Sequence, residues 1–138
     1  MARISESTRE QVRKRAGGRC EYCGIPEEAQ LYPFHVEHIV ALKHGGDSSL
    51  DNLAWSCFDC NVAKGTDIAS YDDETGDLTP LYNPRRQVWS EHFEIDEGQI
   101  IGLTPVGRVT AALLRFNLGG RAADRQALVE ADLWEPPG

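Results

Sequence analysis

The stretch CFDCNVAKG, residues 57–65, decides how this 138-residue chain folds, because it joins a cysteine pair directly to a short helical segment. A second pair, Cys20 and Cys23, lies upstream with the same two-residue spacer. Such a spacer lets one turn present both sulfurs to one ion, and Zn²⁺ takes four thiolates in tetrahedral geometry. The four cysteines, Cys20, Cys23, Cys57 and Cys60, therefore predict a structural zinc site. The alternatives are two disulfides or four buried thiols.

Targeting signals bear on the choice between metal and disulfides. The first residues have no apolar run typical of a signal peptide, and no stretch approaches the roughly 18 apolar residues that a membrane helix needs. We therefore expect a cytoplasmic protein with no membrane partner. In a reducing compartment disulfides rarely persist, which favours the metal.

The net charge of −8 argues against broad, nonspecific adhesion to nucleic acid, which usually requires a basic surface. The charge is uneven, however. Residues 1–65 carry 8 Lys and Arg against 9 Asp and Glu, whereas residues 66–138 carry 6 against 13. Five basic residues gather between positions 9 and 19. They could contact a polyanion, although the commoner outcome is a solvated helix face.

Periodicity and turn residues predict an α+β protein with two parts: residues 1–70 form a core, and residues 71–138 form an extension packed on it. The expected elements of the core are a helix over 5–16, strands over 34–40 and 52–56, and a helix over 57–64. An acidic surface loop is expected over 66–84. The extension is expected to hold a hairpin over 89–95 and 99–103, a helix from 104 to 116 and a last helix over 122–134.

The residues between the two cysteine pairs have the chemistry needed to hydrolyse a phosphodiester. A histidine can take the proton of the attacking water near neutral pH. A divalent ion, bound by carboxylate and amide oxygens, can stabilise the leaving oxygen. Glu37, His38 and Asn61 offer these groups. Adjacent strand residues point to opposite faces, so bringing Glu37 and His38 to one phosphate requires a bulge or the end of a strand.

These motifs together resemble the HNH endonuclease family. The resemblance is carried by VEHIV (36–40), HGG (44–46), Asn52-Leu53 and CFDCNVAKG (57–65), and it covers residues 20–65. The family's ββα-metal fold, also called the His-Me finger, is shared with colicin-type nucleases and with one nuclease domain of RNA-guided CRISPR effectors. The resemblance implies this core held by the four-cysteine zinc site. Residues 81–117 resemble a C-terminal extension of many bacterial members, here a hairpin plus helix.

The resemblance also implies a role for each site residue. His38 matches the general base, and Asn52 matches the middle asparagine that braces the loop and orients the base. Glu37, more often Asp in the family, and Asn61 match the ligands of a catalytic Mg²⁺, Mn²⁺ or other divalent ion. The implied activity is hydrolysis of DNA that leaves a 5′-phosphate and a 3′-hydroxyl. Four further residues are weaker candidates for substrate binding: His35, His44, Lys64 and Arg85.

Two other functions remain open from the sequence. In a noncatalytic zinc module that binds nucleic acid or protein, Glu37, His38 and Asn61 would be incidental, and His38 would be an ordinary strand histidine. A nuclease acting on RNA is the other alternative. One chain carries one active centre, so cutting both DNA strands would need two encounters or a homodimer.

Overall fold

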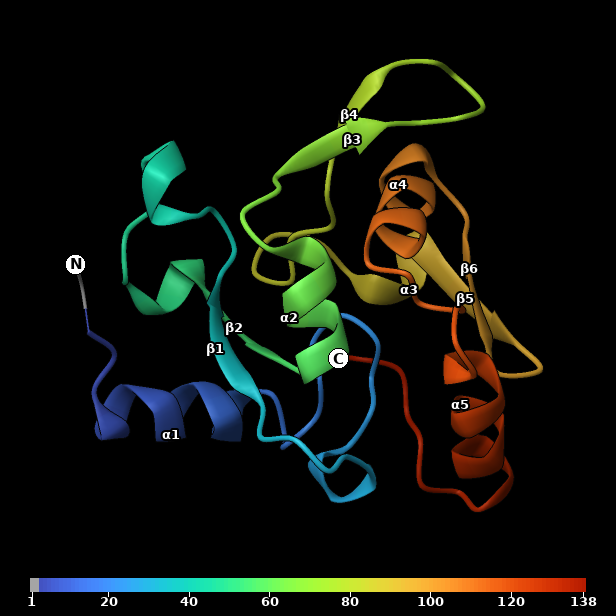
Figure 1. Cartoon of the computed structure of the whole chain (residues 1–138), viewed down its shortest axis with the longest axis horizontal. Helices are drawn as coiled ribbons and strands as arrows, with labels where there is room; N and C mark the ends of the chain where they lie inside the picture. The colour runs from blue at the N-terminus through green and yellow to red at the C-terminus, as the bar shows by residue number, and fades with distance from the viewer. Residues whose placement is uncertain (1–2) are drawn as a thin grey trace.

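The computed structural model describes residues 3–138, which form small antiparallel sheets and short helices in a mixed α/β arrangement (Figure 1). The α-helices of this range are α1 (Glu6–Arg15), α2 (Phe58–Lys64), α3 (Trp89–His92), α4 (Pro105–Leu113) and α5 (Arg121–Glu130). The strands pair as β1 (His35–His38) with β2 (Leu53–Ser56), β3 (Ala69–Tyr71) with β4 (Leu78–Pro80), and β5 (Phe93–Asp96) with β6 (Gln99–Gly102). Single 3₁₀ turns lie at Glu27–Ala29, Leu42–His44 and Leu50–Asn52.

The predicted order of helix, strand, strand, helix in the cysteine-bearing half is confirmed, and it agrees with the ββα-metal fold. β1 and β2 pair antiparallel, with His35 opposite Ser56 and His38 opposite Leu53. Cys57 caps the N-terminus of α2, since its sulfur accepts the Cys60 amide at 3.4 Å. α1 contacts β2 and α2 contacts β1, so the hairpin lies between two helices (Figure 1).

Basic residues of α1 attach this helix to the hairpin. Val12 is its buried apolar residue. The Arg9 guanidinium lies 4.6 Å from the ring centroid of Trp55. Arg15 donates to the Leu53 carbonyl at 2.6 Å. These two arginines therefore stabilise the packing of α1.

The segment 66–84 differs from the expected loop because it contains the hairpin β3–β4, which projects beyond α4 in Figure 1. An ion pair with α4 holds this hairpin in place. The Asp72 carboxylate is buried, and the Arg108 guanidinium of α4 donates to both of its oxygens at 2.9 and 3.0 Å. Two strands of three residues are too short to show a period of two among acidic neighbours, so the sequence pattern missed them.

The extension also differs in detail from the prediction. Trp89–His92 forms α3 and not the start of a strand, and α5 ends at Glu130, before Trp134. The expected hairpin β5–β6 and the helix beginning at Pro105 are confirmed. Buried aromatic residues of the extension belong to the same apolar cluster as Val12 and Leu53 of the first half. The two parts therefore share one core. Within residues 3–138, none of the helices has the length and apolar character required to span a bilayer.

Candidate active site and metal centre

The four cysteines form one buried cluster. Their sulfur atoms all lie within 4.8 Å of one another, and Cys23 Sγ is 3.7 Å from Cys57 Sγ. A tetrahedral zinc site with Zn–S bonds of about 2.3 Å has sulfur–sulfur edges of about 3.8 Å. A disulfide bond would instead be about 2 Å long. The donor set and its spacing therefore fit zinc, and the disulfide alternative is wrong because all four cysteines are free.

The pKa values of the clustered thiols shift in opposite directions. Hydrogen bonds from Cys20, Cys57 and Cys60 lower the pKa of Cys23 well below its ordinary value. The pKa of Cys57 is raised by its bonds to Cys20 and Cys23, and burial raises the pKa of Cys60. Once the first thiolate forms, each further one is therefore harder to form. A bound divalent cation removes this conflict, because it stabilises all four thiolates together.

Glu37, His38 and Asn61, expected to act together, line one pocket of about 330 Å³ between β1, the turn that follows it and α2. The His38 ring is half-buried, and its Nε2 lies 3.0 Å from the Ser48 hydroxyl. Within residues 3–138 the Asn61 side chain has no hydrogen-bond partner, so its amide oxygen remains free to bind a ligand. Ser48 was missed from the sequence because its contact with His38 depends on how the loop folds back.

The end of β1 explains how two adjacent residues reach one pocket. Lys64 Nζ contacts the carbonyl oxygens of His38 and Ile39 at 3.3 and 3.0 Å. In a regular strand, consecutive carbonyls point in opposite directions, so one ammonium could not bind both. The backbone therefore leaves regular strand geometry at His38, and Lys64 stabilises this departure.

The Glu37 carboxylate is 5 % exposed and has two neighbours. Oε2 accepts the Tyr22 hydroxyl at 2.5 Å, and Oε1 forms an ion pair with the Lys64 ammonium. Burial raises the pKa of Glu37 above its ordinary value, although Lys64 and Tyr22 offset part of this effect. Apart from this ion pair, Oε1 has no hydrogen-bond partner. Tyr22 was missed because it stands inside a cysteine knuckle, where an aromatic residue indicates packing.

Asn52 holds the loop after β1 through three hydrogen bonds. Its Oδ1 accepts the Val40 amide at 2.9 Å, and its Nδ2 donates to the carbonyls of Val40 and Asp47 at 2.9 and 2.7 Å. Gly46 must lack a side chain here, since a Cβ atom would lie 1.8 Å from the Val40 oxygen. The loop that carries Ser48 is thereby fixed relative to His38.

The four weaker candidates for substrate binding lie in different surroundings. Lys64 is 1 % exposed, and its ammonium contacts Glu37 and two carbonyls, so this geometry does not present it to a phosphate. His35 is half-buried beside Phe58, with ring centroids 6.4 Å apart. His44 is exposed in the turn Leu42–His44, whose neighbouring residues Leu42 and Lys43 line the pocket of His38.

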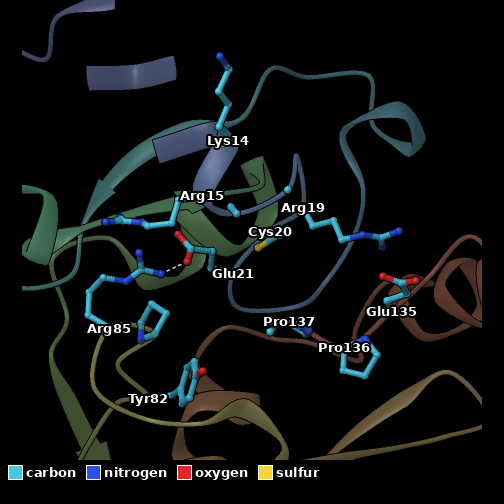
Figure 2. A pocket seen from close by; sticks show the side chains of 14 residues that line it. Lys14, Arg15, Arg19, Cys20, Glu21, Tyr82, Arg85, Glu135, Pro136 and Pro137 are labelled. Atoms are coloured by element: carbon cyan, nitrogen blue, oxygen red, sulfur yellow. Dashed lines mark hydrogen bonds and ion pairs between the residues drawn. The ribbon is translucent and has the colours of Figure 1, made fainter. Parts of the chain in front are cut away.

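Arg85 lies in a different cavity, of about 500 Å³, near the end of α1 (Figure 2). Its guanidinium forms an ion pair with Glu21, and burial together with the neighbouring Arg15 lowers the pKa of Arg85 to about 10. Figure 2 shows Lys14, Arg15 and Arg19 pointing away from one another around this cavity. These cations therefore do not converge on one anion, and Arg85 is not part of the pocket of His38.

Comparison with protein families gives one match: the HNH endonuclease model matches residues 20–67, from the first cysteine knuckle to just beyond α2. Comparison with curated proteins and with solved structures gives no match. The matched segment contains the four cysteines and the pocket residues Glu37, His38 and Asn61. Residues 20–67 of this chain are therefore similar to the HNH endonuclease family, and they carry a four-cysteine candidate zinc site.

Proposed function

We propose that the protein is a metal-dependent endonuclease that hydrolyses DNA phosphodiester bonds and leaves a 5′-phosphate and a 3′-hydroxyl. The observation that carries the proposal is the convergence of Glu37, His38 and Asn61 on one pocket of about 330 Å³ within the segment that matches the HNH family. A nuclease-type function follows from the family match; DNA as substrate and the products are the proposed part.

In this proposal His38 is the general base. We assign the tautomer in which Nε2–H donates a hydrogen bond to the Ser48 hydroxyl, which holds the ring and leaves Nδ1 free to take the proton of the attacking water. Asn52 acts indirectly, because it fixes the loop that carries Ser48. Asn52 is thus a positioning residue.

Glu37 and Asn61 are the residues that would hold the catalytic divalent ion. Their oxygens suit a hard cation such as Mg²⁺ or Mn²⁺, and Glu37 Oε1 lacks a hydrogen bond while Asn61 lines the same pocket. When bound there, such an ion supplies Lewis-acid stabilisation of the leaving oxygen. Glu37 must share its carboxylate between this ion and the Lys64 ammonium.

The zinc site has a structural role in this proposal. All four cysteines are at most 1 % exposed, so water and substrate have no access to an ion held by them. Structural zinc sites use four protein ligands, whereas catalytic ones keep a position open. We therefore propose one structural zinc in addition to the catalytic ion.

One observation favours the rival function, a noncatalytic zinc module. The ion pair with Lys64 neutralises the only carboxylate in the pocket, which lowers its attraction for a cation. Under this alternative the pocket stabilises the end of β1 and carries out no chemistry.

Cleavage of supercoiled plasmid by the zinc-loaded full chain distinguishes the two functions. With Mg²⁺ or Mn²⁺ added, we expect nicked product from the parent protein and a loss of rate of about 10²- to 10⁴-fold in His38→Ala, the range for removal of a general base. His92→Gln is the matched control, because His92 lies on α3 and contacts Thr104. Equal rates for His38→Ala and the parent would refute the assignment of the base, and a parent without activity in any divalent metal would favour the zinc module. Parallel assays on single-stranded DNA and RNA test the substrate class.

A further inference from the structure

The proposed zinc site has a charge that the HNH segment does not balance by itself. Four thiolates and one Zn²⁺ leave a net charge of about −2 in a cluster that is almost inaccessible to water. A buried charge is strongly disfavoured unless an opposite charge or hydrogen-bond donors lie beside it. The residues that contact the sulfur atoms from outside the cluster are therefore of interest.

Arg121, the first residue of α5, contacts the cluster from outside the family match. Its Nη2 donates to Cys60 Sγ at 3.1 Å. The Nη1 atom donates to the carbonyls of Leu114 and Arg115 at 2.7 and 2.8 Å, at the C-terminal end of α4. One guanidinium thus joins a zinc-binding sulfur to the end of a helix in the extension.

Other contacts bring the extension against the cysteine knuckles. The Trp134 indole donates to the Cys23 carbonyl at 3.1 Å, and a Cβ atom on Gly24 would lie 2.7 Å from that indole nitrogen. Arg125, which is 3 % exposed, lies one helical turn after Arg121 and donates to backbone carbonyls of the extension. A second positive charge is therefore fixed near the cluster, although it does not contact a sulfur.

We propose that Arg121 completes the zinc centre from the C-terminal extension: its guanidinium balances the charge of the thiolates through Cys60 and makes zinc affinity depend on the docked extension. The inference rests on the zinc site proposed above. Arg121 is a positioning residue, because it acts on the metal only through a ligand. Groups in this position commonly alter metal affinity by about 10- to 100-fold.

The zinc affinity of the full chain, measured by competition with a chelator, tests whether Arg121 contributes to zinc binding. Arg121→Gln is expected to raise the zinc dissociation constant about 10- to 100-fold. The control is Arg115→Gln, an exposed arginine at the end of α4, and it is expected to bind zinc like the parent. A parent that binds no zinc would overturn the zinc site itself, whereas equal affinities of Arg121→Gln and the control would overturn only the role of Arg121.

A spectroscopic readout separates this role from simple capping of α4. With Co²⁺ in place of zinc, loss of the hydrogen bond to Cys60 raises the energy of the sulfur electrons, so the sulfur-to-cobalt charge-transfer bands should move to longer wavelength in Arg121→Gln. A purely structural arginine would leave these bands unchanged, which would contradict the proposal.

If Arg121→Gln does not fold, the proposal is tested on the parent protein instead, by alkylating its cysteines and mapping by mass spectrometry the order in which they react. In the zinc-loaded parent the four thiolates are nearly equally buried, so Cys60 should react last because the hydrogen bond from Arg121 lowers the nucleophilicity of its sulfur. Early modification of Cys60 would refute the proposal.

Discussion

His38, which lines the small pocket, and Lys64, which is buried against Glu37, have different roles. His38 is half-buried with a single hydroxyl contact, which leaves its ring available for chemistry. Lys64 is buried and contacts the Glu37 carboxylate and the carbonyls at the end of β1. The lysine therefore supports the geometry in which Glu37 and His38 share a pocket.

Removal of Lys64 is accordingly expected to cost stability. Lys64→Met leaves the Glu37 charge buried without its partner, and breaking such a pair typically costs about 3–5 kcal/mol of unfolding free energy. Chemical denaturation of the zinc-loaded protein measures this loss. The exposed Lys43, which lies at the same pocket, provides the control Lys43→Met with little expected change.

Addition of Glu37→Gln to Lys64→Met should recover part of the loss, because the uncompensated charge is then gone. A Lys64→Met protein as stable as the parent would mean that the buried ion pair does not hold the strand end.

At the residue scale, the sequence predicted which polar residues share the pocket, but it did not predict which side chains are buried or what they contact. Glu37, His38 and Asn61 were expected together, and the structure places them together. The burial of Lys64 and the contacts of Tyr22 and Ser48 could not be predicted, since they depend on the departure of β1 from regular geometry. A sequence pattern that assumes ideal strands carries no information about that departure.

At the scale of elements, Asn52 is the side chain that fixes the loop following β1. We expect Asn52→Ala to lower the free energy of unfolding by about 1–3 kcal/mol, since the half-buried amide and carbonyl of Val40 lose their partner, and to slow cleavage as well. Thermal unfolding and the plasmid assay measure the two effects.

Asn117 in the extension offers a closely matched control. Its side chain also holds one residue at both backbone groups, accepting the Ile100 amide and donating to the Ile100 carbonyl, each at 2.9 Å. Asn117→Ala should therefore lower stability without a specific effect on cleavage. Equal effects of both variants on the cleavage rate would show that the loop does not position the catalytic residues.

The hairpin β3–β4 leads to a prediction about pH. Hydrogen bonds from Arg108 lower the pKa of Asp72 below its ordinary value. A carboxyl group with a lowered pKa in the folded state contributes stability above its unfolded pKa of about 3.9 and loses it as the pH falls. The stability difference between the parent and Asp72→Asn should therefore be full at pH 7 and shrink below about pH 4. Denaturation curves across this range measure it, and a difference independent of pH would contradict the role of the ion pair.

Elements were predictable from sequence where local signals were strong. Thr104 with Pro105 has clear chemistry at the start of a helix, and the start of α4 at Pro105 is confirmed. The hairpin β3–β4 and the single turn of α3 are stabilised mainly by contacts with α4 and the shared core. Short elements of this kind depend on tertiary packing, which no local pattern contains.

At the scale of the whole molecule, five arginines of this acidic chain make contacts between its elements. Arg9 and Arg15 attach α1 to the hairpin, Arg108 anchors β3–β4, and Arg121 and Arg125 hold the end of α4 and the turn beside it. Each guanidinium can satisfy several carbonyl or carboxylate oxygens at once. The overall charge could not predict that arginines would join the extension to the segment that matches the HNH family.

The central claim is that a second, hard metal ion binds beside His38, apart from the zinc. Titration of the zinc-loaded full chain with Mn²⁺, followed through the electron paramagnetic resonance of free Mn²⁺, tests it most directly. We predict about one Mn²⁺ per chain, with clearly weaker binding in Asn61→Ala and unchanged zinc content. Absence of Mn²⁺ binding, or equal binding by the parent and Asn61→Ala, would contradict the account and favour a noncatalytic zinc module.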